Sequence, residues 1–501
     1  MFDSKQTTSI AQNAALAITM RWTDRLIGLV SVIILARLLA PEDFGIIVMA
    51  SLVIGLVDAL LDLGVHIPLI QNRSATQSHY DTAWTLRLLQ ATLAAGLVWL
   101  AAPWAADFFD EPQVTLVIQV LAISFLLSGL ENIGVVNFQK EMRFGKEFQF
   151  LFAKRMAGFI ATISLALLLQ SFWALVAGTL VARLVGLALS YAMHPMRPRA
   201  SLARFGEIFG VSQWVLARNV GVYLDQSLHL MLVGRRDTTG VTGGYSMANE
   251  VSSMPTTELL APINRVLFPA FVQVKHDLSE LKRLFLLAQG VQALIVIPAG
   301  VGLALVAEGA VMLLLGEQWG FIVPFVEIIA LVTVVTALMS SGVFVCITLG
   351  RVALMAFYAW FQVALFALLA TVAFTQADAE QIAAIRLLTA LLSVGVFAWI
   401  LTRTLEGLAV LDIIKAIYRP ILAALMMSVC VLGLGGLLSG PDWWLLVCRV
   451  AIGVLSYIFA VALLWWVSGC PPGAERYVLD KLRPVVKPIL RRVSRIGRHT
   501  Y

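Results

Sequence analysis

The stretch "ALAITMRWTDRLIGLVSVII", residues 15–34, has the length of a membrane-spanning helix but carries Arg21, Asp24 and Arg25 near its middle. A transmembrane helix needs about 20 consecutive, predominantly apolar residues. Insertion scales give Arg or Asp at the helix centre a cost of roughly 2.5–3.5 kcal/mol each. Because three such charges are expensive in hydrocarbon, we expect them to face a bundle interior or a water-filled cavity.

The composition of the whole chain also indicates a membrane protein. Of the 501 residues, 60% are hydrophobic and 13% are charged, and the mean hydropathy is +0.88. These values lie outside the range of soluble globular domains. No CxxC spacing or histidine cluster accompanies the four cysteines, so we expect buried thiols, with no disulfide framework, metal site or cofactor. They are Cys346, Cys430, Cys448 and Cys470.

Apolar runs near spanning length recur along the chain and predict an all-α polytopic membrane protein with about 14 transmembrane helices. The seventh and eighth runs are polar enough that hydropathy alone ranks them low. The predicted spans are 12–38, 44–66, 82–104, 113–137, 148–169, 172–193, 207–233, 243–271, 284–306, 322–346, 350–374, 380–402, 418–438 and 443–468.

The distribution of basic residues predicts the topology, because cytoplasmic segments carry an excess of Lys and Arg. With the N-terminus inside, the inside segments hold 25 basic residues, whereas the outside segments hold Arg37, Arg235 and Arg236. Both termini are therefore predicted to be cytoplasmic. Residues 469–501 form a basic tail of net charge +6, which we expect to bind anionic lipid head groups.

An internal repeat follows from two similar segments, "ILARLLAPEDFGIIVMASLV" after the first helix and "MLVGRRDTTGVTGGYSMANEV" after the seventh. A shift of 198 residues aligns Arg37 with Arg235 and Gly45 with Gly243. Six helices separate the copies, so both have the same orientation, as in parallel repeats. We predict two pseudo-symmetric six-helix lobes around a central cavity, with 1–194 as the N-lobe, 195–404 as the C-lobe and 405–468 as two additional helices.

Five segments distributed over residues 10 to 400 carry a family resemblance: "ARLLAPEDFG", "QKEMRFGKE", "SFWALVAGTL", "APINRVLFPAF" and "LLLGEQW". They resemble the recurring signatures of the polysaccharide transport family of Wzx-like oligosaccharide flippases. That family belongs to the multidrug/oligosaccharidyl-lipid/polysaccharide exporter superfamily, which also holds multidrug extruders and lipid II flippases. The resemblance implies a fourteen-helix, two-lobed fold with a central cavity.

The resemblance further implies an alternating-access flippase of the bacterial inner membrane rather than an enzyme. Its substrate would be a polyprenyl-pyrophosphate-linked oligosaccharide, a precursor of polysaccharide, exopolysaccharide or lipopolysaccharide. Expected partners are this lipid, membrane lipids and polysaccharide polymerase or assembly proteins, with no nucleic acid. A lipid II flippase and a multidrug or cation antiporter stay open as alternatives, as do a membrane glycosyltransferase or polymerase and a non-transporting scaffold.

Arginines on the predicted helices suit an anionic substrate, because guanidinium is always charged and its fork matches phosphate oxygens. In the first helix Arg21, Asp24 and Arg25 share one face, and Arg218 and Asp225 repeat such a stripe on the seventh. The predicted cavity residues are Arg21, Asp24, Arg25, Arg87, Arg218, Asp225, Glu250, Asn264 and Arg265.

Two other roles compete for intramembrane charges. Asp58, Asp62 and Glu258 are candidate ion-coupling sites, and each could equally neutralise an arginine. Buried bridges that fix helix register, without substrate contact, are the structural alternative. For the isolated Arg183, Arg386 and Arg449 we favour such a bridge or snorkelling to the interface.

Overall fold

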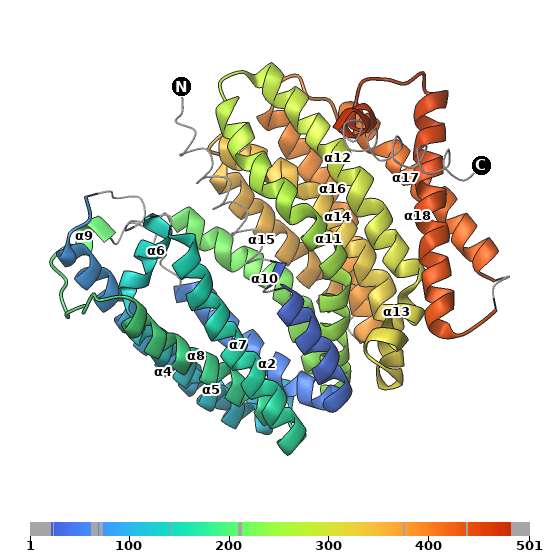
Figure 1. Ribbon diagram of the computed structural model, residues 1–501. Coiled ribbons are helices and arrows are strands. Elements are labelled where there is room, and N and C mark those ends of the chain that lie inside the picture. The colour runs from blue at the N-terminus through green and yellow to red at the C-terminus, as the bar shows by residue number, and fades with distance from the viewer. Residues whose placement is uncertain are drawn as a thin grey trace, which may run out of the picture. The chain divides into compact units, whose positions relative to one another are not determined.

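The computed structural model is built from helices, and none of its described residues forms a strand (Figure 1). It describes residues 22–23, 25–61, 69, 74–141, 143–208, 213–373, 376–436 and 439–481. Eleven helices in this part are long and apolar enough to cross a membrane. The prediction of an all-α polytopic membrane protein is confirmed.

Each of the 14 predicted spans overlaps a helix, but the count of 14 crossings stays a prediction. The first span is described only in part, with residues 25–38 helical after a gap at residue 24. The seventh and eighth spans correspond to α10 (Gln213–Arg236) and α11 (Thr239–Gln273), which are not among the eleven apolar helices. Their charged and polar side chains lower their hydropathy, as the sequence indicated.

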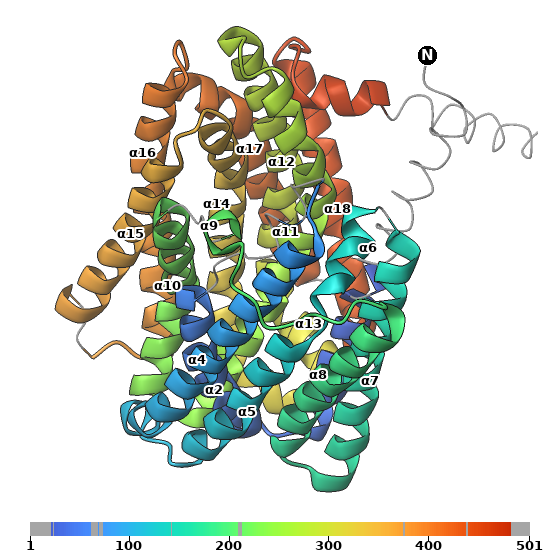
Figure 2. The same ribbon diagram turned by 90° about the vertical axis from the view of Figure 1, so that its left-hand side faces the viewer.

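Contacts divide the chain into two units, Met1–Ser246 and Met247–Tyr501. The division lies inside α11, and the lobe boundaries predicted from the sequence stay predictions. In the first unit α4 packs along α5, and α7 packs along α8, as Figures 1 and 2 show. Besides α10 and the start of α11, the elements of the first unit are α2 (Pro41–Leu61), α4 (Gln77–Phe109), α5 (Gln113–Leu130), η1 (Ile133–Val135), α6 (Val136–Lys140), α7 (Phe144–Leu169), α8 (Trp173–Met193) and α9 (Phe205–Ile208).

Asp43 joins two of the segments that carry the family resemblance. Its Oδ1 accepts a hydrogen bond from the Phe172 backbone N–H at 2.8 Å, and its Oδ2 accepts one from Ala40 N–H at 3.1 Å. Phe172 precedes the first residue of α8, where N–H groups lack helical partners and negative charge is favoured. Asp43 therefore caps the starts of α2 and α8, which gives this residue of the segment "ARLLAPEDFG" a structural role.

The second unit packs α12 against α14 and α17, and α17 against α18. One apolar core includes Phe271, Phe285 and Phe397, and a second includes Val296, Met427 and Tyr457. Besides the main part of α11, the elements are α12 (Leu278–Leu305), α13 (Ala307–Leu314), η2 (Glu317–Ile322), α14 (Val323–Thr348), α15 (Val352–Leu368), the π-helical turn η3 (Leu369–Ala373), α16 (Ala379–Thr404), α17 (Val410–Gly435) and α18 (Asp442–Val467).

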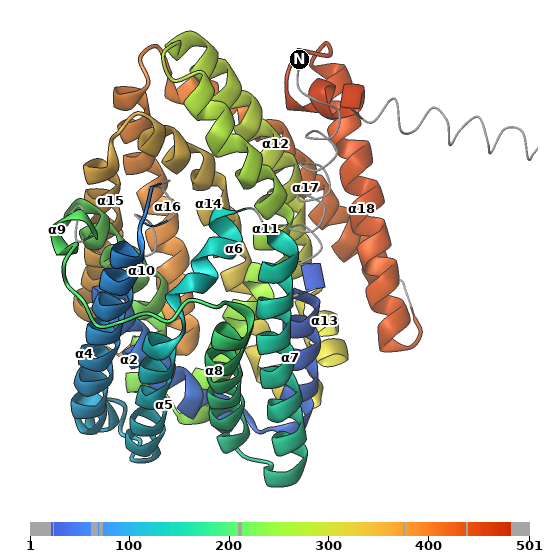
Figure 3. The ribbon, with the colours of Figure 1, turned by 60° about the vertical axis from the view of Figure 1, so that its left-hand side comes forward.

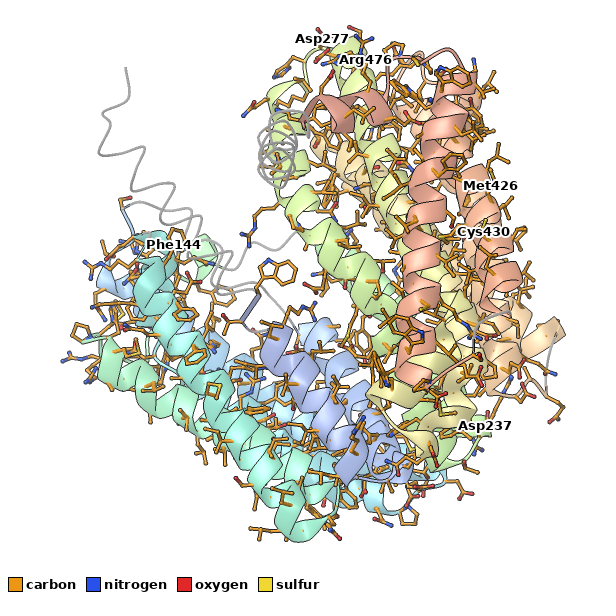
Figure 4. All side chains as sticks on the ribbon, turned by 45° about the vertical axis from the view of Figure 1, so that its right-hand side comes forward. Phe144, Asp237, Asp277, Met426, Cys430 and Arg476 are labelled. Atoms are coloured by element: carbon orange, nitrogen blue, oxygen red, sulfur yellow. The ribbon has the colours of Figure 1, made fainter. Side chains whose placement is uncertain are left out.

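The segment after α18 begins as a packed helix rather than a solvated tail. Residues 474–481 are helical, and the Glu475 carboxylate lies 3.2 Å from Arg419 on α17, with both side chains less than 10% exposed. Arg476 and Asp277, the N-cap of α12, lie at the same end of the unit in Figure 4, while Met426 and Cys430 lie on the outer side of α17. Residues 482–501 are outside the described part.

Candidate functional site

A cavity of about 600 Å³ lies within the first unit, between α2, α4, α5, α8 and the short helices η1 and α6. Helical periodicity explains its lining, because residues three and four apart share a face. Ser51, Gly55 and Asp58 on α2 follow this spacing, as do Thr179 and Arg183 on α8. The full set of polar and charged lining residues is Ser51, Asp58, Arg87, Gln90, Ser124, Ser128, Gln139, Thr179 and Arg183.

Arg87 and Arg183 lie deep along their helices. Arg87 is ten residues after the start of α4, and Arg183 is ten residues before the end of α8. At 1.5 Å per residue each is about 15 Å from that helix end. Arg183 therefore lies at the midpoint of the 21-residue α8, whereas Arg87 lies in the first third of the 33-residue α4. Both guanidinium-bearing residues line the same cavity.

Glu131, which follows α5, neutralises two cations at once. One carboxylate oxygen lies 3.1 Å from Arg87 and the other lies 2.6 Å from Lys154 on α7. The Glu131 side chain is 6% exposed, and a Cβ on Gly186 would come within 2.8 Å of it, so glycine lets α8 approach closely. A buried carboxylate is tolerated when it is fully paired. The network keeps one net positive charge beside the cavity.

Arg183 differs from Arg87 in its surroundings. Among the residues that the structure describes, Arg183 makes no hydrogen bond or ion pair, and it is half-buried in the cavity wall. Asp58 contributes the carboxylate of the lining, and Gln90 donates a hydrogen bond to the Leu61 carbonyl at the end of α2. The cavity thus offers two guanidinium groups, one carboxylate and several hydroxyl and amide groups. Such a set can bind an oxygen-rich anion.

The structure brings together two of the residues predicted from sequence, Arg87 and Asp58. Arg25 is exposed on the helical stretch 25–38, and Arg218 and Asp225 are half-buried on α10. Arg21, Asp24 and Asp62 lie outside the described residues. Their roles in the cavity or in ion coupling stay predictions.

The predicted residues of the second unit lie on α11. Glu250 and Arg265 are exposed, whereas Glu258 and Asn264 are half-buried. Asn264 accepts a hydrogen bond from Gln292 on α12 at 3.1 Å, and Gln292 also reaches Ser340 on α14 at 3.3 Å. Asn264 therefore belongs to a polar network that ties three helices together.

Sequence reasoning did not find Glu131, Lys154 or the cavity position of Arg183. We favoured a buried bridge or snorkelling for Arg183; no such bridge occurs in the described part of the chain, and snorkelling stays a prediction, while the structure places Arg183 in the cavity lining. The four-residue spacing of Thr179 and Arg183 was the available signal. Glu131 gave no such signal, because it stands alone after a span and its partners are 44 and 23 residues away in the chain.

The fold and the cavity define an all-α, multi-pass membrane protein with a charged cavity in its first unit. The solved structure titled lipid II flippase MurJ, inward closed conformation, superposes with a TM-score of 0.70 and 11% identity, over 90% of this chain and 99% of that one. An inward-facing multidrug resistance MATE family transporter gives a TM-score of 0.55 and 12% identity, over 77% and 96%. At these identities the likeness concerns the fold.

The sequence places the chain in a family. Residues 34–324 match the profile described as polysaccharide biosynthesis protein, and the chain belongs to that family. The lipopolysaccharide biosynthesis protein WzxC of Escherichia coli (strain K12) is 28% identical over 314 residues, 61% of this chain and 63% of WzxC. The succinoglycan biosynthesis transport protein ExoT of Rhizobium meliloti (strain 1021) is 25% identical over 413 residues, 80% of this chain and 82% of ExoT. The chain thus spans less than two thirds of WzxC.

Proposed function

We propose that this protein is an alternating-access exporter that moves a polyprenyl-pyrophosphate-linked oligosaccharide across the bacterial inner membrane. The single observation that carries the proposal is the cavity in which Arg87 and Arg183 meet hydroxyl and amide side chains. The pyrophosphate would bind the guanidinium groups, and sugar hydroxyls would exchange hydrogen bonds with the serine, threonine and glutamine side chains.

The charge of the cavity separates this substrate from the main alternative within transport. A multidrug or cation antiporter needs an acidic, aromatic cavity for flat organic cations. Here two arginines face one aspartate, and the aromatic lining consists of Phe125. The names of WzxC and ExoT, which refer to lipopolysaccharide and succinoglycan, also favour a saccharide-linked substrate. A lipid II flippase needs a similar cationic cavity and is therefore included in the test below.

The predicted topology supports loading from the inner leaflet. Both termini and the loops at the start of α4 and the end of α8 would be cytoplasmic. The cavity would then be filled from the side on which lipid-linked sugars are assembled. Polymerase or assembly proteins acting on the outer leaflet would be the partners that receive the product.

A proteoliposome assay tests the proposal. Purified protein is reconstituted with a fluorescent polyprenyl-pyrophosphate oligosaccharide, and a membrane-impermeant quencher reports the leaflet in which the label lies. We expect protein-dependent exchange between leaflets, with no change in the mass of the lipid. A new glycosidic bond would indicate a polymerase or glycosyltransferase instead. Faster exchange of lipid II than of the oligosaccharide lipid would reassign the substrate.

A further inference from the structure

The connection between α8 and α9, residues 194–204, ends in a turn at residues 203–204 and presents a basic face. Pro195 and Pro198 fix φ near −65° at their own positions and stiffen the chain. Exposure alternates along it: Arg197 and Arg199 are exposed, whereas Met196 is half-buried. In an extended chain, residues two apart point to the same side. We call residues 194–204 the linker strap.

The linker strap is held on α4 by its backbone. Three backbone N–H groups of the strap donate hydrogen bonds to side chains of α4: Arg199 to Asp81 at 3.0 Å, Arg204 to Thr82 at 3.2 Å and Ser201 to Thr85 at 2.9 Å. Asp81 and Thr82 are buried, with 9% and 0% of their surface exposed. Asn132 additionally donates to the Met196 carbonyl at 2.7 Å. The arginine side chains are therefore presented from a fixed backbone, which reduces the entropy lost on binding.

The chemistry of the exposed side of the strap is basic and apolar together. Arg197, Arg199 and Arg204 are exposed, and no Asp or Glu occurs from residue 194 to residue 205. Leu202 of the strap and Phe205, the first residue of α9, expose 50% and 43% of their surface. Segments that combine Arg with exposed Leu and Phe bind at the boundary between lipid head groups and acyl chains.

The depth of the strap fits that boundary. It passes from the end of α8 across the end region of α5 and α4 to α9 (Figure 3). The Arg197 guanidinium lies 5.5 Å from the ring centre of Tyr191 on α8. Trp84 lies on α4 between Thr82 and Thr85, which accept hydrogen bonds from the strap. Tyr and Trp are enriched where membrane helices meet the head groups.

We propose that the linker strap is a binding surface for anionic phospholipid head groups of the leaflet at this end of the helices. Arg197 and Arg199 contact the phosphates, and Leu202 and Phe205 enter the acyl boundary. The exposed apolar pair favours a lipid over a soluble polyanion, because it gains nothing from a ligand that stays in water. This surface is separate from the cavity and does not depend on the transported substrate.

Native mass spectrometry of the full chain tests this surface by titrating phosphatidylglycerol or phosphatidylcholine into detergent-solubilised protein. Each arginine near a head group is worth about fivefold in affinity, so Arg197→Gln with Arg199→Gln should weaken phosphatidylglycerol binding about 25-fold. The matched control, Arg403→Gln with Lys415→Gln, removes the same charge from two exposed positions of the second unit. This control should change the affinity for phosphatidylglycerol less than twofold. Phosphatidylcholine binding should be equal in all three proteins.

Further variants separate the lipid from other ligands. Leu202→Ser with Phe205→Ser should also weaken phosphatidylglycerol binding, and Arg197→Lys with Arg199→Lys should preserve it. Thermal melting of each variant checks that the fold is kept. Unchanged binding in the double glutamine variant, or an equal loss in the control, would overturn the proposal. So would displacement of the lipid by inorganic pyrophosphate at equal concentration, which would indicate a soluble-anion site.

Discussion

Gly45 and Gly243 pack against each other where α2 crosses the start of α11. A Cβ on Gly243 would lie 2.7 Å from the Gly45 nitrogen and would overlap the Pro41 carbonyl oxygen. A Cβ on Gly45 would overlap the carbonyl oxygen of Thr239. Pro41 and Thr239 are the first residues of α2 and α11. Pro41 and Thr239 are 198 residues apart in the sequence, as are Gly45 and Gly243. The contact is therefore reciprocal, at the offset of the sequence repeat.

Either glycine should be intolerant of a larger side chain. We expect Gly45→Val and Gly243→Val to lower the melting temperature of the purified protein, since each side chain meets backbone that cannot move aside. Overpacking of this kind costs about 1–3 kcal/mol or more. Gly96→Ala is the control, because nothing lies within 4 Å of its added Cβ. Equal melting temperatures for Gly45→Val and Gly96→Ala would show that the contact between α2 and α11 accommodates the added side chain.

The membrane-spanning helices were predictable from the sequence for a physical reason, whereas the two-lobed repeat stays a prediction. Spans follow from hydropathy, and the repeat follows from turn residues at a constant offset, so both are local signals. Long-range pairs carry no such signal. Asp43 reads as part of a turn, yet it caps α8 through Phe172, 129 residues away. For the site, Arg87 and Asp58 were predictable as intramembrane charges, whereas Glu131 became visible only when α4, α5 and α7 were in place.

The start of the C-terminal segment should be required for stability, while the remainder is expected to be dispensable. Deleting residues 482–501 keeps the Arg419 to Glu475 pair, so expression and melting temperature should be nearly unchanged. Deleting 475–501 leaves Arg419 buried without its carboxylate. Such a loss costs about 3–5 kcal/mol. The two truncations are compared by membrane abundance and thermal melting, and Arg419→Met in the shorter chain should restore part of the loss.

His194, at the start of the linker strap, should make stability depend on pH. Burial lowers the pKa of His194 from its ordinary value of 6.5; Glu141 opposes this, and Lys146, Arg143 and Arg197 reinforce it. The unfolded chain therefore binds the proton more tightly. The contribution of His194 to stability is complete above about pH 6.5 and is lost as the pH falls through the lowered pKa. Melting of wild type and His194→Gln between pH 5 and 8 should differ in slope below pH 6.5, and parallel curves would contradict this assignment.

Glu131 should act as a positioning residue whose loss is seen mainly in stability. Glu131→Gln leaves Arg87 and Lys154 without their carboxylate. Breaking a buried ion pair lowers the free energy of unfolding by about 3–5 kcal/mol, so we expect lower membrane abundance and a lower melting temperature. Adding Lys154→Met should recover part of that stability, because one stranded charge is removed. Transport per molecule in the recovered double variant then reports whether Arg87 still reaches substrate. No recovery of abundance would indicate that the two cations do not share the Glu131 charge.

Arg183 should show the opposite behaviour, a loss of transport without a loss of stability. It lines the cavity and has no ion pair within the described part of the chain, so Arg183→Ala leaves no buried carboxylate unpaired. We expect normal abundance and melting, with leaflet exchange of the oligosaccharide lipid reduced about tenfold or more, because a charge-assisted hydrogen bond contributes roughly 1.5–3 kcal/mol. Arg183→Lys keeps the charge but not the fork and should fall between the two. Arg403→Ala, an exposed position on α16, is the control and should leave exchange unchanged. If Arg183→Ala transports normally while Arg87→Ala does not, the cationic contact belongs to Arg87 alone, and the cavity holds the anion at one point rather than two.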